Sequence, residues 1–412
     1  MPSYRSADPT RTYYAYNAAW SFLSALAFTL SLVYYVRDAG LDPLQMVLVG
    51  TTLELTCFLF EVPTGIVADL YSRRRSIVIG FALIGAGLLL QGLVPTFLAI
   101  LGAQVLWGVG YTFTSGADQA WITDEIGAEQ AARVFVRTQQ FGLAAKIAGT
   151  VTAGGLGLIS LPLPMVISGA GMVLLALLLT LFMREQNFHP VPREERETFR
   201  HAVATFKDGL EVARRRPVVR TLVIISLIGG LSSEAFDRLW SVKILEFTFP
   251  DVFGTSDPAF WFTAFALTGT LLALGASLVL NRFSPERLQA SHPSGILATL
   301  ALLQAAGVLG FALAGYLWLA LAAMWLGAVA GTLTYPIESA WLNRHLDSRT
   351  RATVISMVSQ ANAIGQVVGG PPLGALGRSS LRAALLASGL LLLPIPALFL
   401  RLKDVRRTAE KV

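Results

Sequence analysis

About twelve apolar segments of roughly 20 residues each run through this sequence, and they limit its fold more than any other feature. A helix of about 20 apolar residues crosses the roughly 30 Å hydrocarbon core of a bilayer. Only helices and closed barrels satisfy their backbone hydrogen bonds in lipid. Barrel strands alternate apolar and polar residues, and the stretch from Met172 to Met183 does not. We therefore predict an all-α membrane protein with spans near 13–36, 43–70, 76–94, 97–123, 134–158, 163–183, 219–245, 259–280, 294–314, 316–343, 353–376 and 381–401.

The composition agrees with a membrane protein. Only 14% of the residues are charged and 54% are hydrophobic, whereas roughly a quarter of a soluble domain is charged. The net charge of +6 would suit a nucleic-acid partner, but the basic residues lie in short loops and indicate membrane topology instead. We expect a lipid bilayer and a small-molecule substrate as partners, and no nucleic acid.

The sequence offers little for catalysis or for metal binding. Cys57 is the only cysteine, so no disulfide framework or cysteine-based metal site is expected. The sequence contains no phosphate-binding loop and no HExxH motif. We therefore expect no enzymatic activity, no cofactor and no metal. The first apolar segment is too long for a cleavable signal peptide, so none is expected.

Lysine and arginine placement predicts the orientation and the division into domains. Basic loops alternate with loops poor in positive charge, which places both termini in the cytoplasm of a protein of the cytoplasmic membrane. One connection is long, polar and charged, with the helical spacing of a surface amphipathic helix. We predict an N-terminal six-helix bundle over 1–183, a cytoplasmic linker over 184–218 and a C-terminal six-helix bundle over 219–412.

An internal repeat supports two related halves. A shift of 220 residues places Ala120 and Trp121 on Ala340 and Trp341, and several polar positions of the fourth and fifth spans on those of the tenth and eleventh. Two parallel halves related by an axis along the membrane normal are a known transporter design.

The loop after the second span carries a recognisable motif. Gly65 is followed four residues later by Asp69, and then by Arg73, Arg74 and Arg75. This segment resembles the loop signature of the major facilitator superfamily, whose members have two six-helix bundles and are typically monomers. The resemblance implies that Gly65 allows close helix packing, that Asp69 accepts bonds from the start of the eleventh span, and that the arginines pair with Asp124 or Glu125 as a cytoplasmic gate.

Two further patterns bear on the transport class. The eleventh span contains a helix-packing pattern that resembles an antiporter pattern of the same superfamily; its residues are Gly365, Gly369, Gly370, Pro371 and Gly374. Proton-coupled drug exporters usually carry an arginine in the fourth span where this chain has Gln104. An uncharged side chain cannot shift the pKa of a carboxyl group by its charge, so coupling through that arginine is not expected here.

Charged residues inside spans are costly and usually mark a pathway. Glu61 lies about 12 Å and Glu54 about 22 Å from the cytoplasmic end of the second span, on one helix face. Glu61 is the preferred proton site. Lys146 lies about 20 Å into the fifth span and needs a carboxylate partner, for which Glu61 and Asp118 are candidates.

Other polar residues complete the predicted pathway. Asp118 and its repeat counterpart Glu338 could line the inner mouth or only bond neighbouring helices. In the seventh span, Glu234 and Arg238 are one turn apart and can pair, which leaves Asp237 to face a cavity or another helix. The two candidates for a substrate cavity in the first span are Asn17 and Trp20.

These observations predict a secondary transporter that exports small apolar or amphiphilic organic compounds in exchange for protons, by alternating access. One alternative is a proton-independent facilitator or importer of a metabolite or sugar. An alternative of another class is a non-transporting membrane receptor or scaffold, and a membrane enzyme ranks third.

Overall fold

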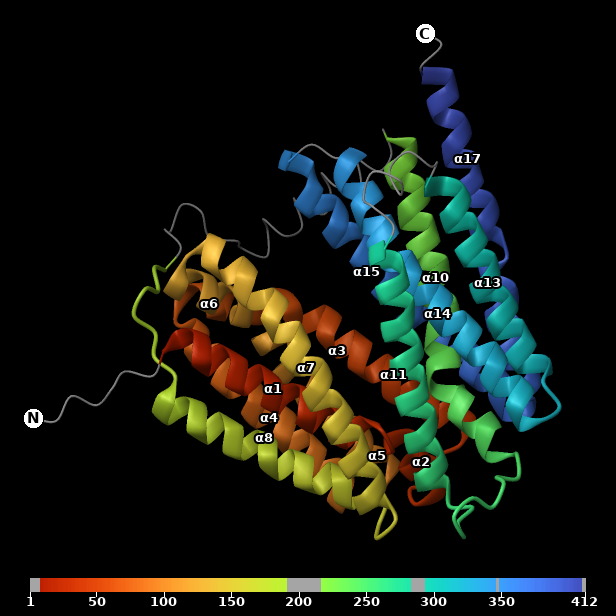
Figure 1. Ribbon diagram of the computed structural model, residues 1–412, viewed down its shortest axis with the longest axis horizontal. Helices are drawn as coiled ribbons and strands as arrows, with labels where there is room; N and C mark the ends of the chain where they lie inside the picture. Colours follow the sequence, from red (N-terminus) through yellow and green to blue (C-terminus); the bar gives the residue numbers. More distant parts are fainter. Residues whose placement is uncertain (1–7, 191–215, 283–292, 346–347, 410–412) are drawn as a thin grey trace, which may run out of the picture. The chain divides into compact units, whose positions relative to one another are not determined.

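The computed structural model describes residues 8–190, 216–282, 293–345 and 348–409, and these are helical apart from short connections (Figure 1). Every predicted span is found. Nine of the twelve are single helices; they are α3 (Pro43–Leu70), α4 (Arg73–Leu93), α7 (Ala128–Gly157), α8 (Leu163–Phe182), α10 (Pro217–Leu245), α11 (Pro258–Arg282), α13 (Pro293–Leu313), α14 (Leu317–His345) and α15 (Ser348–Ser379). The prediction of an all-helical membrane fold is confirmed.

Three spans are broken rather than continuous. The first consists of α1 (Pro9–Phe28) and α2 (Ser31–Arg37), the fourth of α5 (Phe97–Thr114) and α6 (Ala117–Ile126), and the last of α16 (Leu381–Leu392) and α17 (Pro394–Ala409). The break in the fourth span occurs at Gly116, whose φ of 75° suits a residue without a side chain. The break in the last span precedes Pro394, which has no N–H to continue the helix.

Ten of the described helical segments are long and apolar enough to cross a membrane. The two remaining spans, α7 and α15, have sufficient length but carry more polar side chains. They occupy equivalent places in the sequence repeat: Gln140 of α7 corresponds to Gln360 of α15. A polar face on a spanning helix avoids lipid, so both helices are suited to line a polar route.

The chain divides into two compact units. Each unit consists mainly of residues on one side of the central linker and includes one short segment from the other side. Unit 1 contains residues 1–41, 52–202 and 251–264, and unit 2 contains residues 42–51, 203–250 and 265–412. The first turns of α3 thus pack within unit 2, and the first turns of α11 within unit 1. The predicted boundaries at 183 and 219 stay a prediction, and the amphipathic linker helix falls among residues 191–215, outside the described residues.

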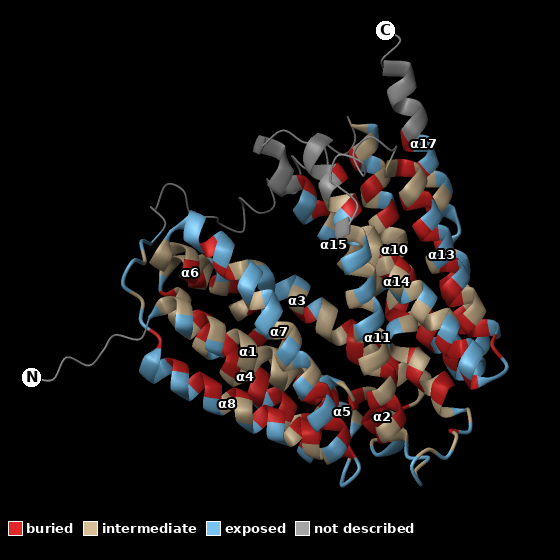
Figure 2. Cartoon of the chain, in the orientation of Figure 1, coloured by how far each residue is buried: buried red, intermediate tan, exposed pale blue. Residues whose placement is uncertain are grey.

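In unit 1, small residues let the helices approach closely. A Cβ atom added at Gly85 of α4 would lie 2.8 Å from the carbonyl oxygen of Gly169 on α8, and one at Gly110 of α5 would lie 2.7 Å from that of Gly80 on α4. Buried positions follow a helical period along α8, while Leu174, Leu177 and Leu181 are exposed. Figure 2 shows this alternation of buried and exposed positions, which is typical of a helix with one face toward lipid.

Unit 2 is built around α10. Its core joins Leu222 of α10, Leu297 and Ala305 of α13, Val354 of α15 and Phe399 of α17, all buried. The glycine pattern of α15 packs on α10 and on the start of α3: a Cβ at Gly365 would lie 2.4 Å from the carbonyl oxygen of Leu227, and one at Gly370 would lie 2.7 Å from the Thr51 hydroxyl. The helix-packing pattern that the sequence singled out therefore lies at close helix crossings.

Candidate functional site

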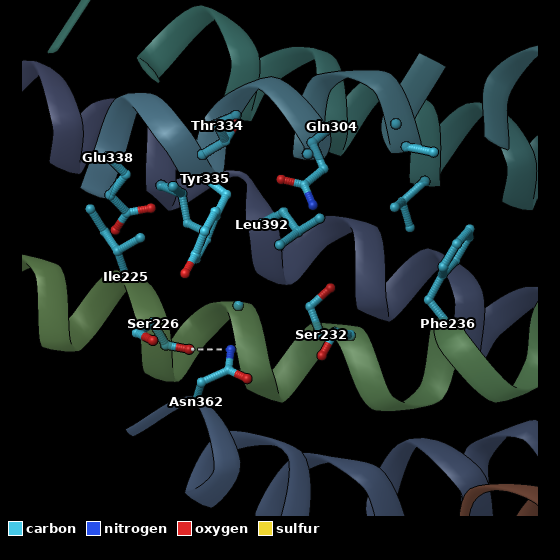
Figure 3. A pocket seen from close by; sticks show the side chains of 18 of the residues that line it. Ile225, Ser226, Ser232, Phe236, Gln304, Thr334, Tyr335, Glu338, Asn362 and Leu392 are labelled. Atoms are coloured by element: carbon cyan, nitrogen blue, oxygen red, sulfur yellow. Dashed lines mark hydrogen bonds between the residues drawn. The ribbon is translucent and has the colours of Figure 1, made fainter. Parts of the chain in front are cut away.

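Unit 2 encloses a cavity of about 870 Å³ between α10, α13, α14, α15 and the junction of α16 with α17. Cavities of roughly 300–1,000 Å³ are the size that holds small organic ligands. Figure 3 shows side chains from α13 and α14 facing α10 across this space, with Ile225 and Glu338 toward one end and Phe236 toward the other. This cavity is the main candidate site of the chain.

One wall of the cavity is formed by α10 and α15, and its polar side chains form hydrogen bonds with neighbouring helices. The Ser226 hydroxyl donates to the carbonyl oxygen of Val358 at 2.6 Å, and the Ser232 hydroxyl donates to that of Ser388 at 2.8 Å. The Asn362 amide donates to the carbonyl oxygen of Ser226 at 3.2 Å and accepts from Gln366 at 2.6 Å. These bonds fix the wall, and Asn362 keeps one amide hydrogen for another acceptor.

The opposite wall carries polar groups that the described residues leave unbonded. The side chains of Gln304 on α13 and of Tyr335 and Glu338 on α14 line the cavity, and none of them has a hydrogen-bond or ion-pair partner among the described residues. They point toward α10 in Figure 3. This wall is equipped to bind a ligand.

The charge of the lining is one-sided. Asp237 and Glu338 both line the cavity, and the described lining residues include no lysine, arginine or histidine. Asp237, which was expected to face a cavity or another helix, lies in this lining, and its role in a transport pathway stays a prediction. Sequence reasoning missed Gln304, Tyr335 and Asn362; the signal that could have found them was a polar side chain inside an apolar span.

A smaller pocket of about 200 Å³ lies in unit 1 beside the break between α5 and α6. Asn17, Trp20 and Asp118 line it, so these three predicted pathway residues are brought together. The Asp118 carboxylate accepts the backbone N–H of Gln119 at 2.7 Å, and the Asn17 amide donates to the carbonyl oxygen of Tyr13 at 3.1 Å. This bond lies within α6, so the expected role of Asp118 in bonding neighbouring helices stays a prediction.

The other predicted pathway residues of unit 1 do not reach this pocket. Glu61 and Lys146 are exposed, and neither forms an ion pair within the described residues. The expected pairing of Lys146 with Glu61 or Asp118 is therefore not observed among the described residues. Glu54 is half-buried and engaged in an interaction.

Gln104 has a role that the sequence did not suggest. It is buried, and its side-chain N–H donates to the side-chain amide oxygen of Gln91 at 3.0 Å, which also accepts the Tyr35 hydroxyl at 2.7 Å. A hydrogen-bonded cluster of Gln91, Gln104 and Tyr35 thus fastens α2 to α4 and α5. Gln104 is not a lining residue of either described pocket.

A charged cluster lies where α3, α4, α6 and the end of α8 meet in unit 1. Arg73 binds Asp124 at 2.7 Å and Asp69 at 3.1 Å. The pairing of an arginine with Asp124 agrees with the expectation, whereas Glu125 instead accepts the backbone N–H groups of Gln186 and Asn187. Bonds from Asp69 to the start of the eleventh span stay a prediction.

Two other residues of this loop, Ser72 and Arg74, bind the C-terminal end of α8 and the residues that follow it. The backbone N–H of Arg74 and the Ser72 hydroxyl both donate to the Glu185 carboxylate, at 3.1 Å and 2.5 Å. The Arg74 guanidinium donates to the carbonyl oxygen of Thr180, while Arg75 is exposed. Gly65 meets no atom within 4 Å of an added Cβ within the described residues, so the close packing expected at Gly65 is not observed.

In unit 2, the predicted pair of Glu234 and Arg238 is present at 3.1 Å, and the Glu234 side chain is 1% exposed. Gly50 of α3 packs directly against this pair, because an added Cβ there would lie 1.6 Å from the Glu234 carboxylate. A second ion pair joins the same end of α3 to α15, between Asp42 and Arg378 at 3.4 Å.

The sequence model of the Major Facilitator Superfamily matches residues 13–370. The chain belongs to this superfamily. It is 20% identical over 359 residues to the uncharacterized MFS-type transporter YxaM of Bacillus subtilis (strain 168), which covers 87% of this chain and 86% of that protein. This major facilitator is thus a multi-pass membrane transport protein for a small-molecule substrate, and not an enzyme.

Solved structures with the same fold include several transporters. The nucleoside transporter NupG aligns with a TM-score of 0.72 at 14% identity, over 96% of this chain and 99% of that one. A bacterial homolog of the human lysosomal transporter Spinster, in an inward-facing and unoccupied conformation, aligns with a TM-score of 0.68 at 16% identity, over 96% and 97% of the two chains. At these identities the likeness establishes the fold of this major facilitator alone.

The charged cluster of this major facilitator leads to a measurable prediction. Arg73 is 17% exposed and Asp124 31%, so solvent screens their attraction less than that of a surface pair. We expect a double-mutant cycle of Arg73→Ala and Asp124→Ala, in reversible unfolding from mixed micelles, to give a coupling free energy of about 1–3 kcal/mol.

The pair of Arg133 and Glu129 serves as the control. It is an ion pair along one helix at 3.1 Å, and its side chains are 80% and 88% exposed. Its coupling should be at most about 0.5 kcal/mol. Equal coupling energies for the two pairs would show that the cluster around Arg73 is an ordinary surface feature.

Proposed function

We propose that this major facilitator exports small amphiphilic organic compounds in exchange for protons, by alternating access between its two halves. The observation that carries the proposal is the cavity of about 870 Å³ in unit 2, whose wall of unbonded polar groups faces a bonded polar wall across an otherwise apolar space. A molecule with an apolar body and a few polar groups suits such a lining. Residues Gln304, Tyr335 and Asn362 would contact it.

Glu61 is the proposed proton carrier. Its side chain is exposed on α3 and forms no hydrogen bond or ion pair with the described residues, so its carboxyl group is accessible to protons. Proton exchange at a single carboxyl group needs such access in at least one state of the transport cycle. The proposed topology places both termini in the cytoplasm, and the cluster around Arg73 would then lie on the cytoplasmic side as part of a gate.

Transport into inverted vesicles tests the proposal. An imposed proton gradient should drive uptake of an amphiphilic dye such as ethidium by wild-type protein, and Glu61→Gln should lower the gradient-driven rate at least tenfold, because glutamine cannot carry a proton. Glu129→Gln is the matched control, since Glu129 is an exposed carboxylate of the same unit. Unchanged gradient-driven uptake by Glu61→Gln would reject Glu61 as the carrier.

A second candidate is a facilitator or importer of a polar metabolite. The hydroxyl and amide groups along the cavity support it, and a nucleoside transporter and a POT family transporter are among the proteins of the same fold. Collapse of the proton gradient in intact cells separates the candidates. Accumulation of substrate should rise for a proton-driven exporter and stay constant for a facilitator.

A further inference from the structure

The internal repeat relates two carboxylates that the structure places in different surroundings. Asp118 and Glu338 each precede a tryptophan by three residues and coincide under the shift of 220 residues. In unit 1, Asp118 lines a pocket of about 200 Å³, and its carboxylate accepts the backbone N–H of Gln119. In unit 2, Glu338 lines the cavity of about 870 Å³. The carboxylate at this position therefore accepts a hydrogen bond in unit 1 and has no bond to the described residues in unit 2.

Glu338 has no counter-charge among the described residues. It forms no hydrogen bond or ion pair there, it is only partly exposed, and the described lining of the cavity contains no basic side chain. A carboxylate in such a place lacks the partner that usually offsets its loss of hydration. A ligand with a positive charge would supply that partner, while a ligand with a negative charge would be repelled by Glu338.

The rest of the cavity suits the apolar part of a cation. Phe236, Tyr335 and Phe399 contribute aromatic rings to the lining, and ring faces attract organic cations while their area binds apolar groups. Tyr335 directly precedes Pro336 and lies one turn before Glu338 on α14. In Figure 3, both side chains point into the space between α14 and α10, so a ring and a carboxylate face the same part of the cavity.

We propose that the substrates of this cavity are amphiphilic organic cations, and that the Glu338 carboxylate makes the binding selective for their positive charge. The inference rests on the proposed function, because it assigns the substrate class of the same cavity. Glu338 binds the cationic group, and the aromatic and aliphatic lining holds the apolar body. Asp118, its counterpart in the repeat, takes no part in charge recognition.

Binding of two probes of similar shape tests this inference without any transport step. Purified protein in neutral detergent is titrated with methyltriphenylphosphonium, which is a cation, and with triphenylphosphine oxide, which is neutral. Wild-type protein should bind the cation at least tenfold more tightly. Glu338→Gln should weaken binding of the cation at least tenfold and change binding of the neutral probe less than twofold, because only the charge is removed.

Two variants keep the result interpretable. Asp118→Asn is the matched control and should leave binding of both probes unchanged. Glu338→Asp keeps the charge on a shorter side chain and should retain preference for the cation. Equal loss of both probes in Glu338→Gln, unchanged binding of the cation in that variant, or no preference of the wild type for the cation would each overturn the inference. Charge-selective binding through Glu338 without gradient-driven transport would support the inference and reject the proposed function.

Discussion

Gly230→Ala is expected to lower the stability of this transporter by about 3 kcal/mol, because the added methyl group has no space. A Cβ atom at Gly230 of α10 would lie 2.0 Å from the carbonyl oxygen of Asn362 and 3.0 Å from the backbone nitrogen of Gln366, both on α15. These are backbone atoms, so no side-chain rotation relieves the overlap. The two helices would have to separate along a crossing that also includes Gly365 and Gly369.

The measurement is thermal unfolding in detergent, followed by tryptophan fluorescence. A loss of about 3 kcal/mol corresponds to a decrease in Tm of roughly 10 °C for a domain of this size. The neighbouring glycine provides the control: a Cβ at Gly229 would lie no closer than 3.8 Å to the Asn362 side chain. Alanine generally favours a helix over glycine, so Gly229→Ala should be neutral or slightly stabilising. A Tm for Gly230→Ala equal to that of Gly229→Ala would contradict the close crossing.

Arg238→Leu is expected to have the second large effect. The variant removes the cation that binds Glu234 at 3.1 Å, and the Glu234 side chain is 1% exposed. Removal of one partner of a buried ion pair leaves a charge without compensation and typically costs about 3–5 kcal/mol. We expect Glu234→Gln to cost less, because Arg238 is 23% exposed and keeps access to water. Unfolding in mixed micelles measures both differences.

The double variant Glu234→Leu/Arg238→Leu separates charge from packing. Two apolar side chains of similar volume often replace a buried ion pair without loss, so the double variant should be more stable than Arg238→Leu alone. Equal or lower stability of the double variant would mean that packing against Gly50, rather than charge, explains the effect of Arg238→Leu.

The sequence predicted the spans well because their cause is local. A segment such as 163–183 is apolar along its whole length, and no tertiary contact is needed to place it in lipid. The pair of Glu234 and Arg238 was also predictable, because residues four apart share one helix face. The breaks at Gly116 and Pro394 carried local signals as well, a glycine and a proline, but an apolar segment that spans a break looks like a single helix when hydropathy alone is read.

The candidate site was less predictable, since the partners of a polar side chain come from other helices. Gln104 occupies a position where related exporters carry an arginine, yet Gln91 and Tyr35 bury it in a structural cluster. Lys146 was expected to pair with a carboxylate, but its side chain is exposed and has no ion-pair partner among the described residues. Gln304 and Asn362 were not singled out, because the sequence pattern does not show whether a polar side chain in a span faces a cavity or the backbone of a neighbouring helix.

The sequence by itself determined that the chain enters a membrane as about twelve helices and which of its residues are costly to place there. Hydropathy and charge are properties of each segment alone, so insertion into the bilayer depends on them and not on contacts between helices. Only the tertiary structure decided which polar side chains of the spans met a partner and which faced a cavity: Gln104 of α5 binds Gln91 of α4, whereas Glu338 lines a cavity of about 870 Å³. That difference depends on how helices far apart in the sequence pack around each side chain, which the residues of one segment do not specify.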